Sequence, residues 1–182
     1  MASALHIVGN NFSQTPSRLD ITPPNTRGAH PAMTDPTVYA DDLQPGQRHD
    51  LGVHTVSESE LVDFASQWDP QSFHVDSAAA DSGAFGGLIA SGIHSLAIAQ
   101  RLAVSSVLRS WSVIAGRRLR EMEFLAPVRP GDTLSGSMRI ESVDLDARGR
   151  GLVTYTTELV NQTGVAVLRF DADVYLRSRG AH

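Results

Sequence analysis

Residues 91–109 read SGIHSLAIAQRLAVSSVLR, and their spacing predicts a long helix that is apolar around most of its circumference. On a helical wheel the polar side chains fall in one narrow stripe, made of His94, Arg101, Ser105 and Arg109. The rest of the surface carries Ile93, Leu96, Ala97, Leu102, Ala103, Val104, Val107 and Leu108. A helix of this length spans about 28 Å, so we expect it to cross a whole domain with a sheet curved around it.

The segments after this helix alternate with period two, which is typical of strands with one buried face. Strands are predicted at Trp111–Leu125, Thr133–Val143, Gly151–Asn161 and Val165–Leu176. The segment Asn161-Gln162-Thr163-Gly164 has the composition of a hairpin turn. Antiparallel strands that follow one long apolar helix predict an α+β fold in which the sheet wraps the helix.

The segments before the helix predict a strand and a capped helix. Gln47–Val56 alternates as an exposed strand does. Ser57 and Glu60 read as a capping box, in which Ser57 accepts from the Glu60 N–H and the Glu60 carboxylate reaches back. The next helix should bury one face and end before Asp69-Pro70, because proline disfavours a helical conformation at the residue before it. That face is made of Leu61, Phe64, Ala65 and Trp68.

Composition restricts the domain organisation and the function classes. Residues 1–32 are rich in Pro, Asn, Ser and Thr and lack periodicity, so we expect a flexible tail before a single domain at 33–182. The net charge of −5 and the lack of a basic block argue against a nucleic-acid or membrane surface as the main function. With no cysteine, the chain has no disulfide, thiolate nucleophile or Cys-ligated zinc. The start of the chain does not resemble a signal peptide, and no segment approaches the length of a membrane span, so we expect a soluble cytoplasmic protein.

Asp69 and His74 are the first candidates for catalysis. They stand five residues apart, in a segment that carries Pro70 and that we expect to form a loop. A carboxylate and an imidazole that converge on a water can orient it and take its proton, because imidazole titrates near neutrality. The structural alternative is that Asp69 ends a helix and His74 caps a turn, and spacing alone does not decide between them.

Three further candidates lie on the long helix. Ser91 can cap its N-terminus, and the N–H of Gly92 points outward at the positive end of the helix dipole, where it can stabilise an oxyanion. An ordinary cap, followed by a glycine kept for close packing, is the alternative. Gln100 falls among apolar positions on the wheel, where its amide needs a partner in the sheet or in a bound ligand.

Other catalytic templates are missing from the sequence. It contains no Gly-x-Ser-x-Gly, Walker loop, dinucleotide fingerprint or His-Glu-x-x-His, which argues against an elbow-type hydrolase, a P-loop enzyme and a zincin. The densest basic cluster, Arg117, Arg118 and Arg120, can either meet phosphates or form a solvated strand face.

Three ordered segments read WDPQSFHVD at 68–76, FGGLIASGIH at 85–94 and FLAPVRPGDTL at 124–134. Together they resemble the MaoC-like dehydratases, the (R)-specific enoyl-CoA hydratase group of the hot-dog fold, and the similarity runs from about residue 38 to residue 177. The resemblance implies a sheet around a long helix, homodimers or higher oligomers, and acyl thioesters of coenzyme A or acyl carrier protein as substrates. By motif position, Asp69 and His74 would activate a water, and the Gly92 N–H would hold the thioester carbonyl.

The chain departs from the family's pattern at two places. The family's stricter loop reads Asp-x-Asn-Pro-x-His, whereas Gln71 and Ser72 replace the Asn-Pro pair here, and its common His-Gly is Ser91-Gly92. The position eight beyond that glycine, a serine in some members, is Gln100. We therefore assign Ser91 and Gln100 to the substrate pocket as a hypothesis.

The resemblance predicts the addition of water to a trans-2-enoyl thioester, or the reverse elimination, with no metal or redox cofactor. Two rivals stay open at this point. A thioesterase on the same scaffold would direct the water at the carbonyl, and a non-catalytic subunit would bind an acyl thioester without turnover.

Overall fold

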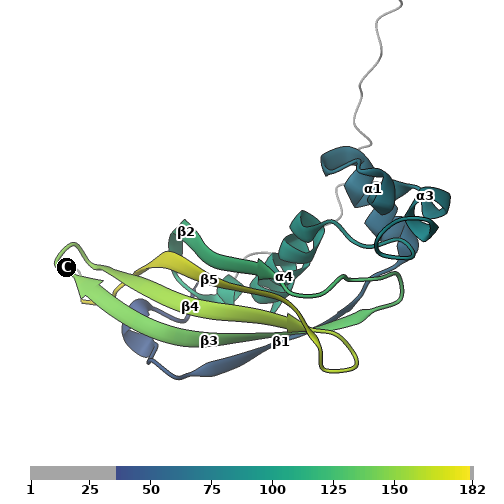
Figure 1. Cartoon of the computed structure of the whole chain (residues 1–182). Coiled ribbons are helices and arrows are strands. Elements are labelled where there is room, and N and C mark those ends of the chain that lie inside the picture. The colour runs from purple at the N-terminus through teal and green to yellow at the C-terminus, as the bar shows by residue number, and fades with distance from the viewer. Residues whose placement is uncertain (1–35, 181–182) are drawn as a thin grey trace, which may run out of the picture. The chain divides into compact units, whose positions relative to one another are not determined.

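The computed structural model describes residues 36–180, so the predicted tail at residues 1–32 lies outside the described part of the chain. Figure 1 follows the chain through its elements. In order these are η1 (Ala40–Asp42), β1 (Arg48–Thr55), α1 (Glu58–Trp68), α2 (Ser72–Val75), α3 (Ser77–Asp81), α4 (Gly92–Ser106), η2 (Leu108–Ser110), β2 (Val113–Phe124), β3 (Thr133–Asp146), β4 (Arg150–Val160) and β5 (Ala166–Arg177). Among residues 36–180, no helix is both long enough and apolar enough to cross a membrane.

The five strands form one antiparallel sheet in the order β1-β3-β4-β5-β2. Hairpins join β3 to β4 and β4 to β5, whereas β1 and β2 form the two edges of the sheet. The turn after β4 forms as predicted, since the Asn161 side chain accepts from the Val165 N–H at 3.0 Å and Gly164 takes a left-handed conformation with φ of +81°. The predicted strands and the α+β class are confirmed.

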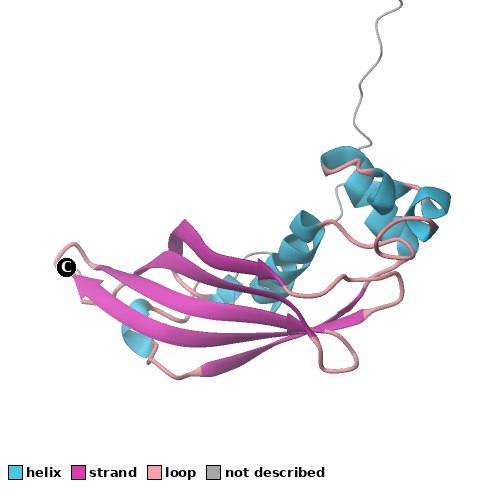
Figure 2. Cartoon of the chain, viewed as in Figure 1, coloured by secondary structure: helices cyan, strands magenta, loops and turns pink. Residues whose placement is uncertain are grey.

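The core lies between α4 and the face of the sheet against which it packs (Figure 2). Gly136 of β3 allows this close approach, because a Cβ at that position would lie 3.3 Å from Leu102 Cδ1 on α4 and 3.0 Å from Leu51 Cβ on β1. The inward side chains of the strands alternate with outward ones as predicted. The buried set includes Ile98, Ala99, Leu102 and Ala103 on α4 and Leu134, Met138, Ile140, Leu168, Phe170, Ala172, Val174 and Leu176 on the strands.

The central helix is shorter than predicted. α4 ends at Ser106, and the residues up to the predicted end at Arg109 belong largely to the separate turn η2. The Ser106 hydroxyl donates to the Leu102 carbonyl at 2.7 Å, and a serine that bonds back to the preceding turn weakens the helix locally. Val107 follows in a distorted helical conformation, with φ of −118°. Local side-chain bonding, which the wheel does not represent, therefore ends the helix.

Two predictions about helix faces are wrong. On α4, His94 from the predicted polar stripe is only 3% exposed, whereas the apolar Ile93 is 54% exposed. On α1, Leu61 and Ala65 are buried as predicted, but Trp68 is 72% exposed. The sheet covers α4 from one side only, and a helix that is apolar nearly all round does not indicate which side that is.

Only one of the two hydrogen bonds of the predicted capping box forms at the start of α1. The Ser57 hydroxyl accepts from the Glu60 N–H at 3.2 Å, as predicted. The Glu60 carboxylate instead accepts from the imidazole of His54 on β1, at 2.9 Å. An imidazole donor from another element thus replaces the local backbone donor, because tertiary packing places it closer to the carboxylate.

The environments of two histidines, His49 and His94, predict that the folded protein becomes less stable as the pH falls. Burial lowers the pKa of His49, and burial also lowers the pKa of His94 despite its contact with the Glu60 carboxylate. In the unfolded chain both groups return to a pKa near 6.5. Between that value and the folded pKa the unfolded chain binds more protons, so acidification through this window favours unfolding. We expect the melting temperature to fall from about pH 7.5 to about pH 5.5.

Thermal melts followed by circular dichroism across this pH range check the prediction. His49→Phe keeps a ring against Trp111, whose centroid lies 5.8 Å from that of His49, and removes one titrating group. This variant should therefore show a shallower pH dependence than the wild type. A melting temperature that stays constant or rises on acidification would contradict the expectation.

Candidate active site

Asp69 and His74 lie on either side of a short break between two helices. Asp69 is the C-cap of α1, and its φ of −156° takes the chain out of the helix just before Pro70. His74 lies in α2, a single helical turn, so the prediction that the whole segment is a loop is wrong for this residue. The His74 N–H bonds to the Gln71 carbonyl at 2.8 Å within this turn, which brings the backbone of His74 back toward Asp69.

The Asp69 carboxylate is held at both oxygens. Oδ1 accepts from the Gln71 amide at 2.8 Å, and Oδ2 accepts from the Ser91 hydroxyl at 2.7 Å. The bond from Ser91, followed by the one from Gln71, holds the pKa of this carboxyl below its usual range, and the nearby His74 adds to the effect. Asp69 is therefore ionised and fixed in orientation at neutral pH.

The contacts of His74 fix which of its nitrogens is free. The ring is buried, and Nδ1 lies 2.8 Å from the Ile89 carbonyl oxygen, which can only accept. Nδ1 therefore carries the proton in the neutral ring, and Nε2 presents its lone pair 3.4 Å from Asp69 Oδ2. A nitrogen base and a carboxylate at this separation can hold one water and remove its proton.

Ser91 and Gly92 bring the N-terminus of α4 to the same place. Ser91 caps the helix by accepting from the Ile93 N–H at 3.2 Å while it donates to Asp69. Gly92, the first residue of α4, has no carbonyl partner within the helix for its N–H. A Cβ on Gly92 would lie 2.7 Å from the ring of Phe124, so only glycine fits without displacing that ring. A negative charge that develops here would be stabilised by the helix dipole.

A cavity of about 500 Å³ joins these groups, which is a volume typical of small-molecule sites. Most of its wall is apolar, and its polar groups gather around Asp69 and His74. It is lined by Asp69, Gln71, His74, Phe85, Ile89, Ala90, Ser91, Gly92, Ile93, Ser95, Phe124, Leu125, Ala126, Pro127, Val128 and Val167. The structure thus brings together four of the predicted residues, Asp69, His74, Ser91 and Gly92, at one cavity.

Gln100 lies elsewhere in this chain. It is exposed, and it lines a second cavity of about 360 Å³ with Arg117, Arg118 and Tyr155. Burial raises the pKa of Tyr155 to about 12. Eight residues of helix place Gln100 roughly 12 Å along the axis from Gly92, so the two do not meet within one chain. Arg120, the third residue of the predicted basic cluster, forms an ion pair with the buried Asp173 at 2.8 Å.

Two contributors to the site were not among the predicted residues. Gln71 orients Asp69, and Phe124 packs against Gly92 from the end of β2. Gln71 stood in the sequence as a departure from the family's loop, and that change could have identified it. Phe124 opens the segment 124–134 that carries part of the family resemblance, but the contact of its ring with Gly92 depends on how the edge strand packs.

The comparisons with known proteins agree with this fold. The family model described as MaoC like domain matches residues 42–163. A MaoC-like dehydratase from Rhodospirillum rubrum shares 35% identity at a TM-score of 0.71, over 78% of this chain and 98% of that one. The R-hydratase PhaJ1 from Pseudomonas aeruginosa shares 25% identity at a TM-score of 0.64, over 78% of this chain and 87% of that one.

A protein from Mycobacterium tuberculosis described as having a double hot-dog fold is similar over 79% of this chain and 45% of its own, with 21% identity and a TM-score of 0.66. This likeness confirms the predicted hot-dog architecture of the sheet and α4. The family match covers the segment that contains Asp69, His74, Ser91 and Gly92. The chain therefore belongs to the MaoC-like dehydratase family.

Proposed function

We propose that this protein adds water to a 2-enoyl thioester to give the 3-hydroxyacyl thioester, or removes it in the reverse direction. One observation carries the proposal. His74 Nε2 and Asp69 Oδ2 lie 3.4 Å apart at a cavity whose wall also contains Gly92, the first residue of α4. Membership of a family that includes an R-hydratase supports the same reaction class.

The proposed reaction assigns one step to each group. His74 Nε2 takes a proton from a water that lies in the cavity beside this nitrogen and Asp69, while the water oxygen bonds to Cβ of the substrate. The electrons of the double bond move toward the thioester oxygen, where the Gly92 N–H and the helix dipole stabilise the enolate. The proton on Nε2 then returns to Cα, which restores the starting state. Asp69 stays ionised and stabilises the imidazolium.

The proposed substrate is a thioester of coenzyme A or of acyl carrier protein. The apolar wall of the cavity suits an acyl chain, and its polar end suits the reacting Cα, Cβ and carbonyl. The proposed steps move only protons and one water, so they require no metal or redox cofactor.

A panel of trans-2-enoyl-CoA thioesters, from short to long, tests the proposal. Hydration removes the absorbance of the conjugated thioester and releases no thiol, so absorbance and free thiol are measured together. Thiol release would favour the thioesterase, and binding without any change of the substrate would favour the non-catalytic subunit.

The protein is further proposed to act as a homodimer or a higher homo-oligomer. β2 is an edge strand, and one side of its backbone has no strand partner within the described chain. Apolar side chains are exposed along this strand, namely Val113, Ile114, Leu119 and Phe124, and α4 also exposes Ile93 and Val104. Such an edge is a template for pairing with a second copy, which would also cover the apolar side chains.

Leu119→Glu is expected to convert the assembly to monomers, because it places a charge in the centre of β2, where Leu119 is 50% exposed. Leu145→Glu is the matched control, since Leu145 is 56% exposed but lies on β3, away from this edge. Light scattering after size exclusion measures the mass of each variant. A wild-type mass in Leu119→Glu, or equal dissociation in both variants, would argue against pairing through β2.

A further inference from the structure

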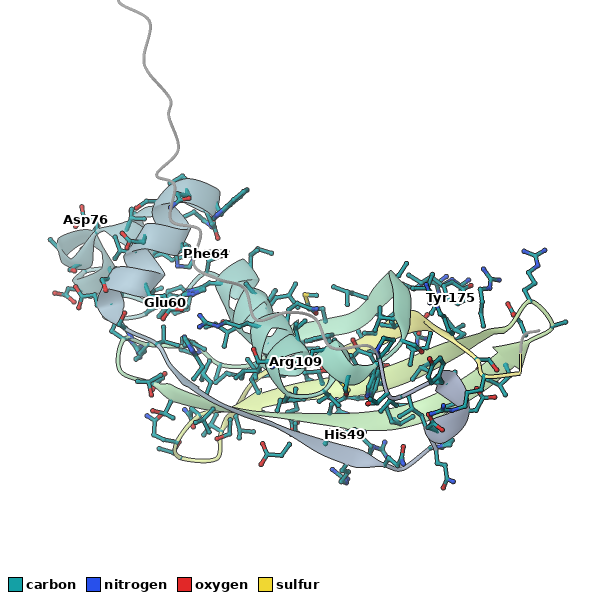
Figure 3. All side chains as sticks on the ribbon, turned by 180° about the vertical axis from the view of Figure 1, so that it is seen from behind. His49, Glu60, Phe64, Asp76, Arg109 and Tyr175 are labelled. Carbon is teal, nitrogen blue, oxygen red and sulfur yellow. The ribbon has the colours of Figure 1, made fainter. Side chains whose placement is uncertain are left out.

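A second cluster of polar side chains joins three elements beside the cavity. The Glu60 carboxylate on α1 accepts from His54 Nε2 on β1, at 2.9 and 3.0 Å to its two oxygens, and from His94 Nε2 on α4 at 3.4 Å. Phe64, one turn further along α1, stacks on the His94 ring with centroids 4.5 Å apart. Figure 3 labels Glu60 and Phe64 on the α1 side of this cluster.

Glu60 is an ionised carboxylate between two donors. A carboxylate only accepts, so both imidazoles direct an Nε2–H toward it. Burial acts to raise the pKa of Glu60, but the hydrogen bonds from His54 and His94 help to outweigh burial and lower it. Within residues 36–180, the other nitrogen of His94 is buried without a hydrogen-bond partner. The neutral Nε2–H form of His94 therefore fits this cluster, because protonation would add an unpaired N–H.

This cluster connects the same two helices as the catalytic hydrogen bond. Asp69 directly follows α1 and accepts from Ser91, the N-cap of α4, at 2.7 Å. Glu60, in the first turn of α1, accepts from His94 in the first turn of α4. The contact at Glu60 thus limits how α1 can shift or rotate, and with it where Asp69 lies. Glu60 does not line the cavity.

We propose that Glu60 is a positioning residue, which holds α1 against α4 so that Asp69 keeps its place beside Ser91 and His74. The role rests on the proposed function, because Asp69 and His74 are taken as the groups that handle the water. Displacement of a catalytic group by about 1 Å can cost roughly a hundredfold in rate. Loss of the Glu60 contacts should therefore lower kcat, while KM changes little, because Glu60 does not line the cavity.

The test compares Glu60→Ala with matched variants in hydration of one enoyl-CoA. Glu60→Ala should lower kcat by about ten- to a hundredfold with KM within about threefold. Glu60→Gln keeps an oxygen that can accept from one imidazole and should recover much of the loss. Glu58→Ala, at an exposed site in the same turn, should match the wild type. Val62→Ala, which trims a half-buried apolar side chain of α1 and removes no hydrogen bond of the cluster, controls for general loosening.

A second readout does not depend on turnover. In protein labelled with ¹⁵N-histidine, the Nε2 resonance of His74 reports the nearby Asp69 carboxylate, and it should shift in Glu60→Ala but not in Glu58→Ala. If the wild type hydrates no thioester, the proposed function fails while this resonance still tests the positioning role. A wild-type kcat and resonance in Glu60→Ala, or an equal loss of kcat in Val62→Ala, would overturn the proposal.

If Glu60→Ala does not fold, His54→Phe takes its place. It removes one of the two donors to Glu60 and leaves the carboxylate in α1. A lower kcat with a shifted His74 resonance supports the positioning role, and wild-type values for both overturn it.

Discussion

Replacing His74 with alanine is expected to slow hydration of an enoyl thioester by about 10²- to 10⁴-fold, the usual contribution of a positioned general base. The reason is the fixed tautomer, since Nδ1 is committed to the Ile89 carbonyl and Nε2 is the nitrogen that can take the proton. The fold should persist, because Ser91 still donates to Asp69 and the core is untouched. Initial rates from the absorbance of the conjugated thioester measure the loss.

Asp69→Asn should cause a loss of similar size, because it removes the charge that stabilises the imidazolium. In the proposed mechanism both groups handle one water, so the double variant should be little worse than the poorer single variant. Asp63→Asn is the control, since Asp63 is an exposed carboxyl on the same helix. Near-normal hydration in either catalytic variant would remove the basis for the proposed reaction.

Gly151→Ala is expected to lower the stability of the fold, because an added Cβ has no room at this position. Gly151 is buried in β4, and a Cβ there would overlap the Cβ of Ala40 in η1 and lie 3.0 Å from Leu145 Cδ2. Ala40 is fully buried and has no side-chain torsion that could relieve the overlap, so η1 must move. Overpacking of this kind costs about 1–3 kcal/mol of unfolding free energy.

Urea denaturation of Gly151→Ala and of Gly116→Ala measures this cost. Gly116 is the matched control, because it also lies in a strand but a Cβ there meets no atom within 4 Å. The expected result is a lower midpoint for Gly151→Ala and a midpoint close to wild type for Gly116→Ala. Equal urea midpoints for the two variants would mean that η1 moves aside at little cost in unfolding free energy.

The fold could be predicted from periodicity because its core elements are regular. Period two in β5 identified the face that is buried, and the run of apolar residues identified α4. The side of α4 that the sheet covers could not be predicted, because a helix that is apolar nearly all round gives a weak directional signal. Ile93 and His94 were therefore assigned to the wrong environments, and the exposed Gln100 to an apolar one.

The candidate site could be predicted only as a set of residue types. The motif placed Asp69, His74, Ser91 and Gly92 in one hypothesis, and they now line one cavity. The bonds that define their chemistry depend on tertiary contacts. Neither the donation from Ser91 to Asp69 nor the carbonyl of Ile89 that fixes the His74 tautomer can be derived from spacing along the chain.

Phe124 links the edge of the sheet to the end of α4 that borders the candidate site. It ends β2, and its ring occupies the space that a side chain on Gly92 would need. Under the proposed pairing of β2 with a second copy, dissociation would free the strand that carries this ring. Specific activity would then depend on protein concentration, and dilute assays would underestimate the turnover of the assembled enzyme.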